Sequence, residues 1–199
     1  MFNIIIEKCP ESVNVSGHFM DIETDFRSIL KCLNVLETYD EEIAGKMALK
    51  LFFKDKVPID MNTAIEIFEG FIQFNTNALD ETDESIDEDD ENEDDERFFD
   101  LMFDSNYIYC AFKQVYDIDL SDHKIKMHWW KFKTLLSGLP NITKMSSIIE
   151  IRSSEMPKDP KYRSSLVKLK EAHKLPNKDK IDGQNAENLI DTLFRWAVE

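Results

Sequence analysis

The sequence SNYIYCAFKQVYDIDLSDHKIKMHWWKFKTLLSGLP, which runs from Ser105 to Pro140, decides the fold class. Its apolar residues recur every three or four positions, which is the spacing of one helix face. A short polar segment after Tyr116 interrupts this pattern, and Gly138 followed by Pro140 ends it. The stretch therefore predicts two amphipathic helices, and the tight turn between them favours an antiparallel pair.

The second of these helices has a start signal in the sequence. Ser121 suits the N-cap, and Asp122 follows at the first helical position, where its negative charge meets the positive end of the helix dipole. Leu120 and Ile125 have the spacing of a hydrophobic staple across such a cap. We therefore expect this helix to begin at Asp122 and to bury one stripe: Ile125, Trp129, Phe132 and Leu136.

The aromatic run from His128 to Phe132 has both a packing and a binding interpretation. Trp129 lies on the apolar stripe and is predicted to be core. Trp130 is about 100° further round the helix, so it faces a second layer, a partner or solvent. Lysines flank it, and interfaces favour Trp beside basic residues. The candidate partner-binding residues are Tyr109, Trp130, Lys131 and Lys133.

The negative charge of the chain is concentrated in one segment. The net charge is −16, but residues 80–96 hold thirteen acids and no Lys or Arg, so the other 27 acids nearly balance the 24 bases. Dense like charges repel, which predicts an exposed, disordered acidic linker over residues 77–97. A solvated spacer is the simplest role. A nucleic-acid mimic, an ion sink and a docking tail are the alternatives, whereas the absence of Gly argues against an EF-hand.

The rest of the chain predicts a hairpin and more helices. An extended run covers residues 2–7, and a hairpin around Ser16 and Gly17 covers residues 12–22. Candidate N-caps precede helical patterns on both sides of the acidic run: Thr24, Asp40, Asp60, Asn141, Asp159 and Asn185.

The predicted fold is therefore mainly α, a helical bundle with a small N-terminal β-hairpin and an acidic disordered linker. The expected divisions are a hairpin plus three helices over 1–76, the linker over 77–97, a helical part over 98–175 packed with the N-terminal part, and a linker with a last helix over 176–199.

No catalytic, metal-binding or cofactor-binding motif is present in the sequence. His123 and His128 are five residues apart, whereas a two-histidine zinc motif on a helix needs a spacing of four. Five glycines in the whole chain nearly exclude phosphate-binding loops. We therefore predict that the protein is not an enzyme and holds no metal or cofactor.

Cysteine usage and hydropathy point to a soluble intracellular protein. Cys9, Cys32 and Cys110 form no CxxC pair, which is typical of reduced, buried thiols. The N-terminus lacks a signal-peptide pattern, and no apolar run approaches the ~20 residues of a membrane helix.

Two sequence blocks resemble a known family. Thr24-Asp25-Phe26-Arg27 and His128-Trp129-Trp130-Lys131-Phe132, with the tyrosine-rich segment 107–109 and the pair Ile148 and Arg152, resemble the tailed-phage and prophage "gene product fifteen" family. The resemblance covers most of residues 3–155.

This resemblance implies a role in the phage tail module. By genomic analogy the protein is expected to be a tail assembly chaperone in the host cytoplasm. It would bind the tape-measure protein and/or the major tail protein, with a homo-oligomer also possible and no nucleic acid or membrane partner. The alternatives are a structural tail component retained in the virion, and an acidic DNA mimic or decoy that binds a host protein.

Overall fold

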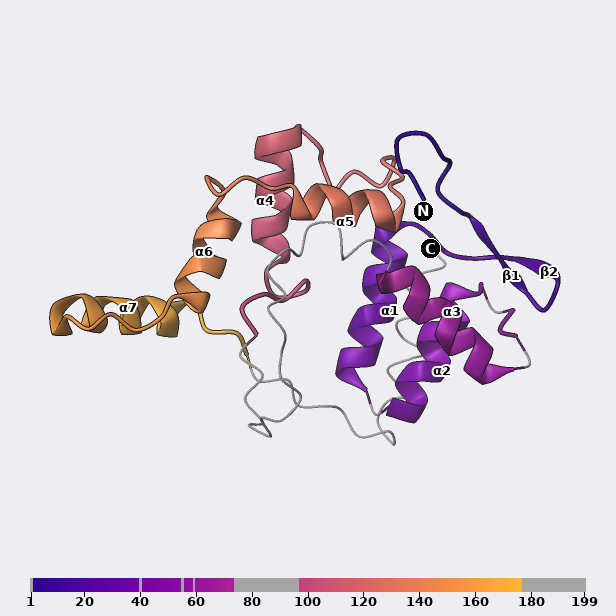
Figure 1. Cartoon of the computed structure of the whole chain (residues 1–199), viewed down its shortest axis with the longest axis horizontal. Coiled ribbons are helices and arrows are strands. Elements are labelled where there is room, and N and C mark those ends of the chain that lie inside the picture. The colour runs from indigo at the N-terminus through magenta and orange to yellow at the C-terminus, as the bar shows by residue number, and fades with distance from the viewer. Residues whose placement is uncertain (1, 40, 55, 59, 74–96, 177–199) are drawn as a thin grey trace. The chain divides into compact units, whose positions relative to one another are not determined.

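The computed structural model describes residues 2–39, 41–54, 56–58, 60–73 and 97–176 (Figure 1). The chain is mainly helical with one antiparallel hairpin, as predicted. The elements in chain order are β1 (Ser12–Val15), β2 (His18–Asp21), α1 (Phe26–Thr38), α2 (Glu41–Phe52), α3 (Met61–Gln73), α4 (Ser105–Tyr116), α5 (Trp129–Ser137), α6 (Lys144–Ser153) and α7 (Pro160–Ala172). The acidic run and the helix expected after Asn185 lie outside the described residues.

The chain divides into two compact units. Of the described residues, unit 1 comprises those before residue 74 together with 127–131, and unit 2 comprises 97–126 and 132–176. The short segment 127–131 therefore belongs with the N-terminal elements, although it lies far from them in the sequence.

The predicted hairpin is present, with a tight turn at Ser16 and Gly17. Val13 pairs with Met20 and Val15 with His18. Ser16 and Gly17 both have positive φ, 51° and 87°, which matches the right-handed twist of two strands joined by a two-residue loop. The Gly17 N–H also donates to the side chain of Asn14 over 2.9 Å.

The extended run predicted for residues 2–7 is wrong, because this segment forms a helical turn. The Glu7 N–H donates to the Asn3 carbonyl over 2.8 Å, and the Ile5 N–H donates to the Asn3 side chain over 3.0 Å. The Glu7 carboxylate in turn accepts from the Asn3 N–H. Local capping by a polar pair thus outweighs the β propensity of three isoleucines.

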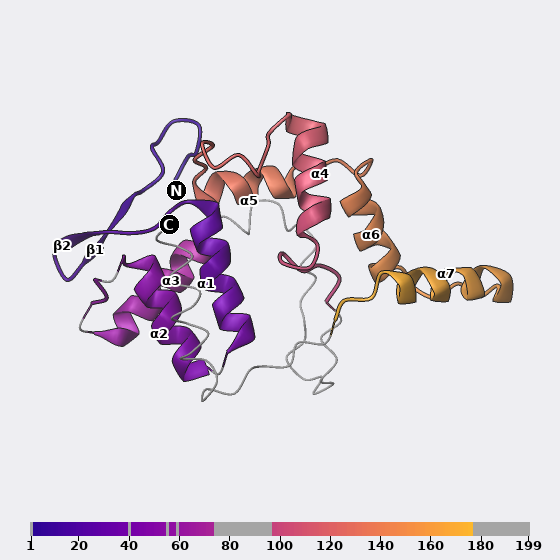
Figure 2. The ribbon, with the colours of Figure 1, turned by 180° about the vertical axis from the view of Figure 1, so that it is seen from behind.

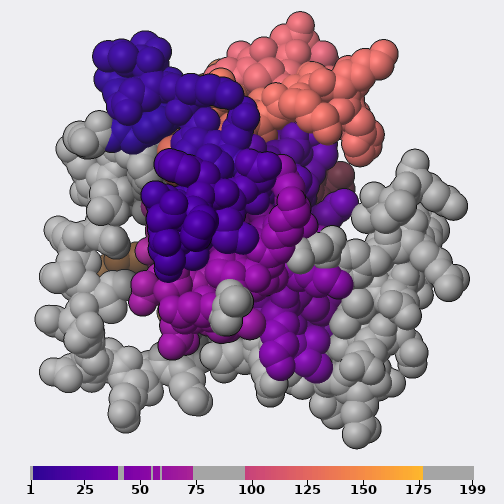
Figure 3. Space-filling model, turned by 90° about the vertical axis from the view of Figure 1, so that its right-hand side faces the viewer, coloured from indigo at the N-terminus to yellow at the C-terminus, as the bar shows by residue number. Residues whose placement is uncertain are grey.

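Helices α1, α2 and α3 pack side by side in unit 1 (Figures 1 and 2). The buried face of α1 consists of Phe26, Ile29, Cys32 and Val35. Val35 and Tyr39 pack with Ala44 and Met47 of α2. Phe52 lies at the centre of an aromatic cluster, with the rings of Phe53, Phe68 and Phe71 at centroid distances of 4.9–5.2 Å. Figure 3 looks onto the hairpin side of this unit.

The helix starts of unit 1 follow the predicted chemistry with small shifts. Asp25 is the N-cap of α1 and accepts from the Arg27 N–H over 3.0 Å, so the predicted cap at Thr24 is wrong by one residue. Asp60 accepts from the N–H of Asn62 and from both donors of Thr63, as a cap of α3 does. Asp40 lies outside the described residues.

Two predicted buried positions are exposed. The helical spacing of the apolar residues in α3 predicts that Ile65 faces inward, but it is 38% exposed, because the buried side of α3 passes through Ala64, Phe68 and Phe71. Cys110 is also exposed, whereas Cys9 and Cys32 are buried. The Cys32 thiol donates to the Ala48 carbonyl over 3.6 Å, and burial raises its pKa to about 12, which makes it an inert core thiol.

The predicted start of the helix that contains the two tryptophans is wrong. Helix α5 begins at Trp129, seven residues after Asp122, and residues 117–128 form a longer connection. Ser121 does not cap a helix, since its N–H and hydroxyl both donate to Asp119, over 3.0 and 2.6 Å. Asp122 accepts from the Lys124 N–H over 2.9 Å. These local bonds offer the backbone an alternative to a helix.

Unit 2 is built on α4, α6 and the part of α5 after Lys131. The rings of Phe112 and Phe132 stack with centroids 5.2 Å apart, and the Tyr116 hydroxyl donates to the Leu135 carbonyl over 2.8 Å. Figure 1 shows that α4 and α5 cross, so the predicted antiparallel pair is wrong. The longer connection after α4 removes the constraint that a tight turn would impose.

The two following helices have side-chain caps. Thr143, rather than the predicted Asn141, caps α6 and accepts from the Ser146 N–H over 3.2 Å. Asp159 caps α7 with Pro160 at the first turn, as predicted, and accepts from the Lys161 N–H over 2.9 Å.

Candidate functional site

Residues 127–131, here called the clip, join the N-terminal end of α1 by backbone hydrogen bonds. The Phe26 N–H donates to the Met127 carbonyl over 2.9 Å, and the Trp129 N–H donates to the Thr24 carbonyl over 2.7 Å. Asp25 and His128 form the β-bridge between them. The start of α1 and the start of α5 are therefore fixed by the same interaction.

His128 completes the clip through both ring nitrogens. Its Nδ1 accepts from the Trp130 N–H over 3.1 Å, so the proton of the neutral ring lies on Nε2, which donates to the Pro10 carbonyl over 3.0 Å. Burial lowers the pKa of His128, and Lys131 acts in the same direction. The clip thus requires a neutral histidine of one tautomer.

The two indoles of the clip bind the end of α3. The last four carbonyl groups of a helix lack partners within it. Trp130 Nε1 donates to the Phe71 carbonyl over 2.9 Å, and Trp129 Nε1 donates to the Ile72 carbonyl over 3.4 Å. The Trp130 ring also packs on Phe2, Phe71 and His128 at 5.0–5.3 Å between centroids. The WW pair is therefore a structural C-terminal cap.

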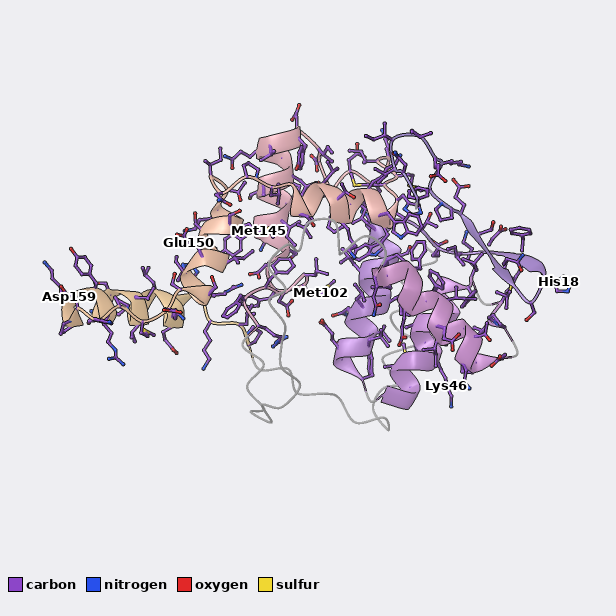
Figure 4. The ribbon with its side chains drawn as sticks, in the orientation of Figure 1. His18, Lys46, Met102, Met145, Glu150 and Asp159 are labelled. Atoms are coloured by element: carbon purple, nitrogen blue, oxygen red, sulfur yellow. The ribbon has the colours of Figure 1, made fainter. Side chains whose placement is uncertain are left out.

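Unit 2 carries an open groove of about 670 Å³, here called the groove. Five apolar residues line it: Phe99, Leu136, Leu139, Met145 and Ile149. Among the described residues that line it, Glu150 is the only charged one, beside serines and an asparagine. Figure 4 shows Met145 and Glu150 on α6. Such a surface suits apolar side chains of a partner.

A buried ion pair fixes two walls of the groove. Arg152 of α6 donates to both carboxylate oxygens of Asp104, over 2.7 and 2.9 Å, and to the Phe98 carbonyl over 3.1 Å. Its Nε donates to the His173 carbonyl over 2.7 Å. Phe99 follows Phe98, and Ile149 lies about one turn before Arg152, so this guanidinium positions both residues. A bidentate Arg–carboxylate pair has the geometry for that task.

Comparison with known proteins gives one family match. Residues 5–175 match the family described as Bacteriophage Gp15 protein, which is most of the chain. The chain belongs to the bacteriophage Gp15 protein family. No curated protein and no solved structure matches it.

The two blocks that carried the Gp15 resemblance in the sequence meet in the structure. Thr24 to Arg27 and His128 to Lys131 are the two sides of the clip. Arg152, the last residue of the resemblance, is the buried partner of Asp104. Most of these residues therefore have structural explanations, whereas Lys131 is exposed.

The candidate partner-binding residues do not form one surface within either unit. Trp130 is 8% exposed, so its predicted alternative as an exposed binding residue is wrong and the second-layer alternative holds. Lys131 is exposed in unit 1, whereas Tyr109 and Lys133 are half-buried in unit 2. Whether any of them contacts a partner stays a prediction.

The groove and the ion pair were not predicted from the sequence. The groove combines Phe99 with residues of α5, α6 and the loop between them, and no local pattern reports such a combination. Arg152 has a basic side chain on a helix, which periodicity alone assigns to solvent.

Metal and membrane features give no further site in the described residues. In the ranges that the structure covers, no three His, Cys, Asp or Glu side chains gather closely enough to hold a metal ion. Among the described helices, none combines the length and the apolar character that a membrane crossing needs.

Proposed function

We propose that this Gp15 family member is a non-enzymatic tail assembly factor that acts as a chaperone in the host cytoplasm. Its partner is the tape-measure protein and/or the major tail protein. The groove carries this proposal, because it is an open apolar surface on a helical unit of a phage protein.

The groove has the chemistry of a helix-binding site. An amphipathic helix binds a groove by inserting side chains at spacings of three and four residues. Burial of one Leu, Phe or Met side chain contributes about 1.5–3 kcal/mol. The tape-measure protein, a long helical chain that would aggregate alone, offers many such side chains. The large negative charge of the chain would keep the complex soluble.

A binding role also fits the side chains around the groove better than catalysis does. Enzyme sites bring together titratable groups that act on one substrate. Glu150 is the one ionisable side chain that lines the groove, and its other polar residues are hydroxyls and an amide. This composition supports an assembly factor over a hydrolase or a transferase.

Co-expression with the neighbouring tape-measure protein tests the proposal. The chain is expected to keep that protein soluble and to co-purify with it. Ile149→Asp places a charge in the groove and should abolish both effects. Ile142→Asp is a matched control, since Ile142 is 79% exposed and does not line the groove. Equal behaviour of the two variants, or solubility without this chain, would overturn the proposal.

Mass spectrometry of purified virions separates the chaperone from a structural tail component. An assembly factor leaves the particle, so we expect the chain to be absent or far below one copy per tape measure. Stoichiometric presence in particles would favour the structural component.

A further inference from the structure

We propose that helix α7 is a second interaction surface, distinct from the groove, whose exposed apolar seam binds an acidic amphipathic helix of another protein. The seam consists of Tyr162, Leu166, Leu169 and His173. This inference does not rest on the tape-measure proposal, because it uses different residues and a different ligand chemistry.

The seam has the spacing of a coiled coil. Its residues are separated by four, three and four positions, so Tyr162 and Leu169 occupy d positions, and Leu166 and His173 occupy a positions. None of the residues of α7 is buried. Tyr162 is 66% exposed and Leu169 is 45% exposed. Leu166 and His173 are half-buried. A narrow stripe with exposed apolar residues is the pattern of a helix that pairs with one other helix.

Helix α7 contacts the rest of unit 2 chiefly near its C-terminal end, where Leu166, Lys170 and His173 are half-buried. Val167, Lys170 and Glu171 line a small cavity of about 340 Å³ together with Phe98 and Arg152. The Arg152 guanidinium also holds the C-terminal end of α7 through the His173 carbonyl. At 100° per residue, Val167 lies well away from the row of Tyr162, Leu166 and Leu169. The contact with unit 2 therefore leaves Tyr162 and Leu169 open, whereas it partly covers Leu166 and His173.

The charges beside the seam define the partner. Arg163 and Lys170 occupy the e positions on one flank, and the small residues Ser165 and Ala172 occupy the g positions on the other. Lys161 and Lys168 add positive charge, and Glu171 is the one acid between residues 160 and 172. The complementary helix has apolar residues at a and d and Asp or Glu opposite Arg163 and Lys170.

Other ligands fit these observations less well. An antiparallel pair of α7 helices would oppose like charges at the e positions, and a parallel pair would place Arg163 and Lys170 beside Ser165 and Ala172, which offer no opposite charge. An anionic bilayer or a nucleic acid would meet a chain that has 40 acids against 24 bases. A discrete acidic helix can pair with the local basic surface and avoid that repulsion.

The test uses the full chain and two labelled synthetic peptides in fluorescence anisotropy. Both peptides have Leu at a and d. One has Glu at e and g, and the other has Lys at those positions. We expect binding of the Glu peptide only, with an affinity that falls as salt rises. Leu169→Asp should abolish binding, and it should leave the circular dichroism spectrum unchanged because this side chain is 45% exposed.

A pair of double variants separates charge matching from general attraction. Arg163→Glu with Lys170→Glu should lower the affinity for the Glu peptide about tenfold or more and create binding of the Lys peptide. Lys161→Glu with Lys168→Glu makes the same change in net charge away from the e positions. It should have a much smaller effect.

Four outcomes would overturn the inference. They are the absence of Glu-peptide binding, an equal loss in both double variants, tighter binding to phosphatidylglycerol vesicles or to a single-stranded oligonucleotide, and binding that requires deletion of residues 80–96. Neither peptide is a tape-measure sequence, and Ile149→Asp should leave peptide binding intact. A failure of the groove proposal is therefore distinguishable from a failure of this one.

Discussion

At the scale of single residues, the two tryptophans differ in what their indole N–H groups do. Trp130→Phe keeps the ring packing but leaves the Phe71 carbonyl without its donor, and the hydrogen bond lost is 2.9 Å long and buried. We expect a loss of about 1–2 kcal/mol in the free energy of unfolding. Trp129→Phe loses a bond of 3.4 Å and should cost less. Urea denaturation measures both. A larger loss for Trp129→Phe would contradict this assignment.

His128 gives a pH dependence whose sign follows from its contacts. Burial lowers its pKa in the folded chain, so the unfolded chain takes up the proton first as pH falls. Stability should therefore decline as pH drops below the ordinary histidine pKa of about 6.5, and this decline should level off below the folded value. The hydrogen bond to the Pro10 carbonyl and the charge of Glu11 oppose the shift, and Lys131 reinforces it, while Asp25 lies opposite in the bridge.

The measurement is the urea midpoint of the parent chain and of His128→Asn between neutral and mildly acidic pH. Asn has no proton to gain there, so its curve should lack the His128 component, and the difference between the two curves isolates it. Identical pH dependence in the two chains would show that His128 does not control the stability of the clip.

At the scale of elements, Asp104 and Arg152 hold α4 and α6 together. Both side chains are almost fully buried, and the Asp104 carboxylate also accepts from the Asp100 N–H over 3.0 Å. Arg152→Ala leaves a buried carboxylate without its cation and should cost about 3–5 kcal/mol. Arg152→Lys should not rescue it, since an ammonium cannot reproduce the fork of guanidinium donors.

The double variant Asp104→Asn with Arg152→Met is the informative control for this pair. It removes both charges together, so it should be more stable than Arg152→Ala alone. Thermal unfolding followed by circular dichroism gives the order. A double variant less stable than Arg152→Ala would mean that the hydrogen bonds to Phe98 and His173 dominate over the charge pair.

The elements also show where local sequence rules succeed and where they fail. The caps at Asp60 and Asp159 and the turn at Ser16 and Gly17 were predictable, because each is decided within a few residues. The start of α5 was not, because residues 127–129 pair with residues 24–26, about a hundred positions away. Ser121 and Asp122 have side chains suited to a helix cap. In the structure, however, the Ser121 hydroxyl donates to Asp119 and the Asp122 carboxylate accepts from the Lys124 N–H. These local Asx-type bonds compete with helix formation.

The candidate site was less predictable than the fold, again because it depends on contacts between residues that are far apart in the sequence. The sequence pattern left open whether Trp130 faces a second layer, a partner or solvent, because its burial depends on Phe2 and Phe71 from distant elements. The seam of α7 is the opposite case, because the sequence spacing of Tyr162, Leu166, Leu169 and His173 places them on one helix face. Their periodicity was correct, but it could not say whether that face would be covered.

At the scale of the whole molecule, the acidic run is expected to control the solubility of the protein and not its folding. Deletion of residues 80–96 removes thirteen acids and changes the net charge from −16 to −3. The described core uses none of these residues, so we expect unchanged helicity and an unchanged urea midpoint. Solubility at neutral pH should fall, because a chain near zero net charge repels its copies only weakly. Circular dichroism, urea titration and ammonium sulfate precipitation measure these quantities.

Replacement of residues 80–96, instead of their deletion, distinguishes the two roles that the acidic run could have in phage assembly. A solvated spacer can be replaced by a Ser/Asn segment of equal length without loss of phage yield, provided that the protein stays soluble. A DNA mimic or decoy requires the carboxylates themselves, so that replacement would abolish its activity. A replacement with an equal number of acids in scrambled order controls for charge alone. Full phage yield with the Ser/Asn segment would remove the decoy alternative and leave the groove and the α7 seam as the surfaces through which this chain acts.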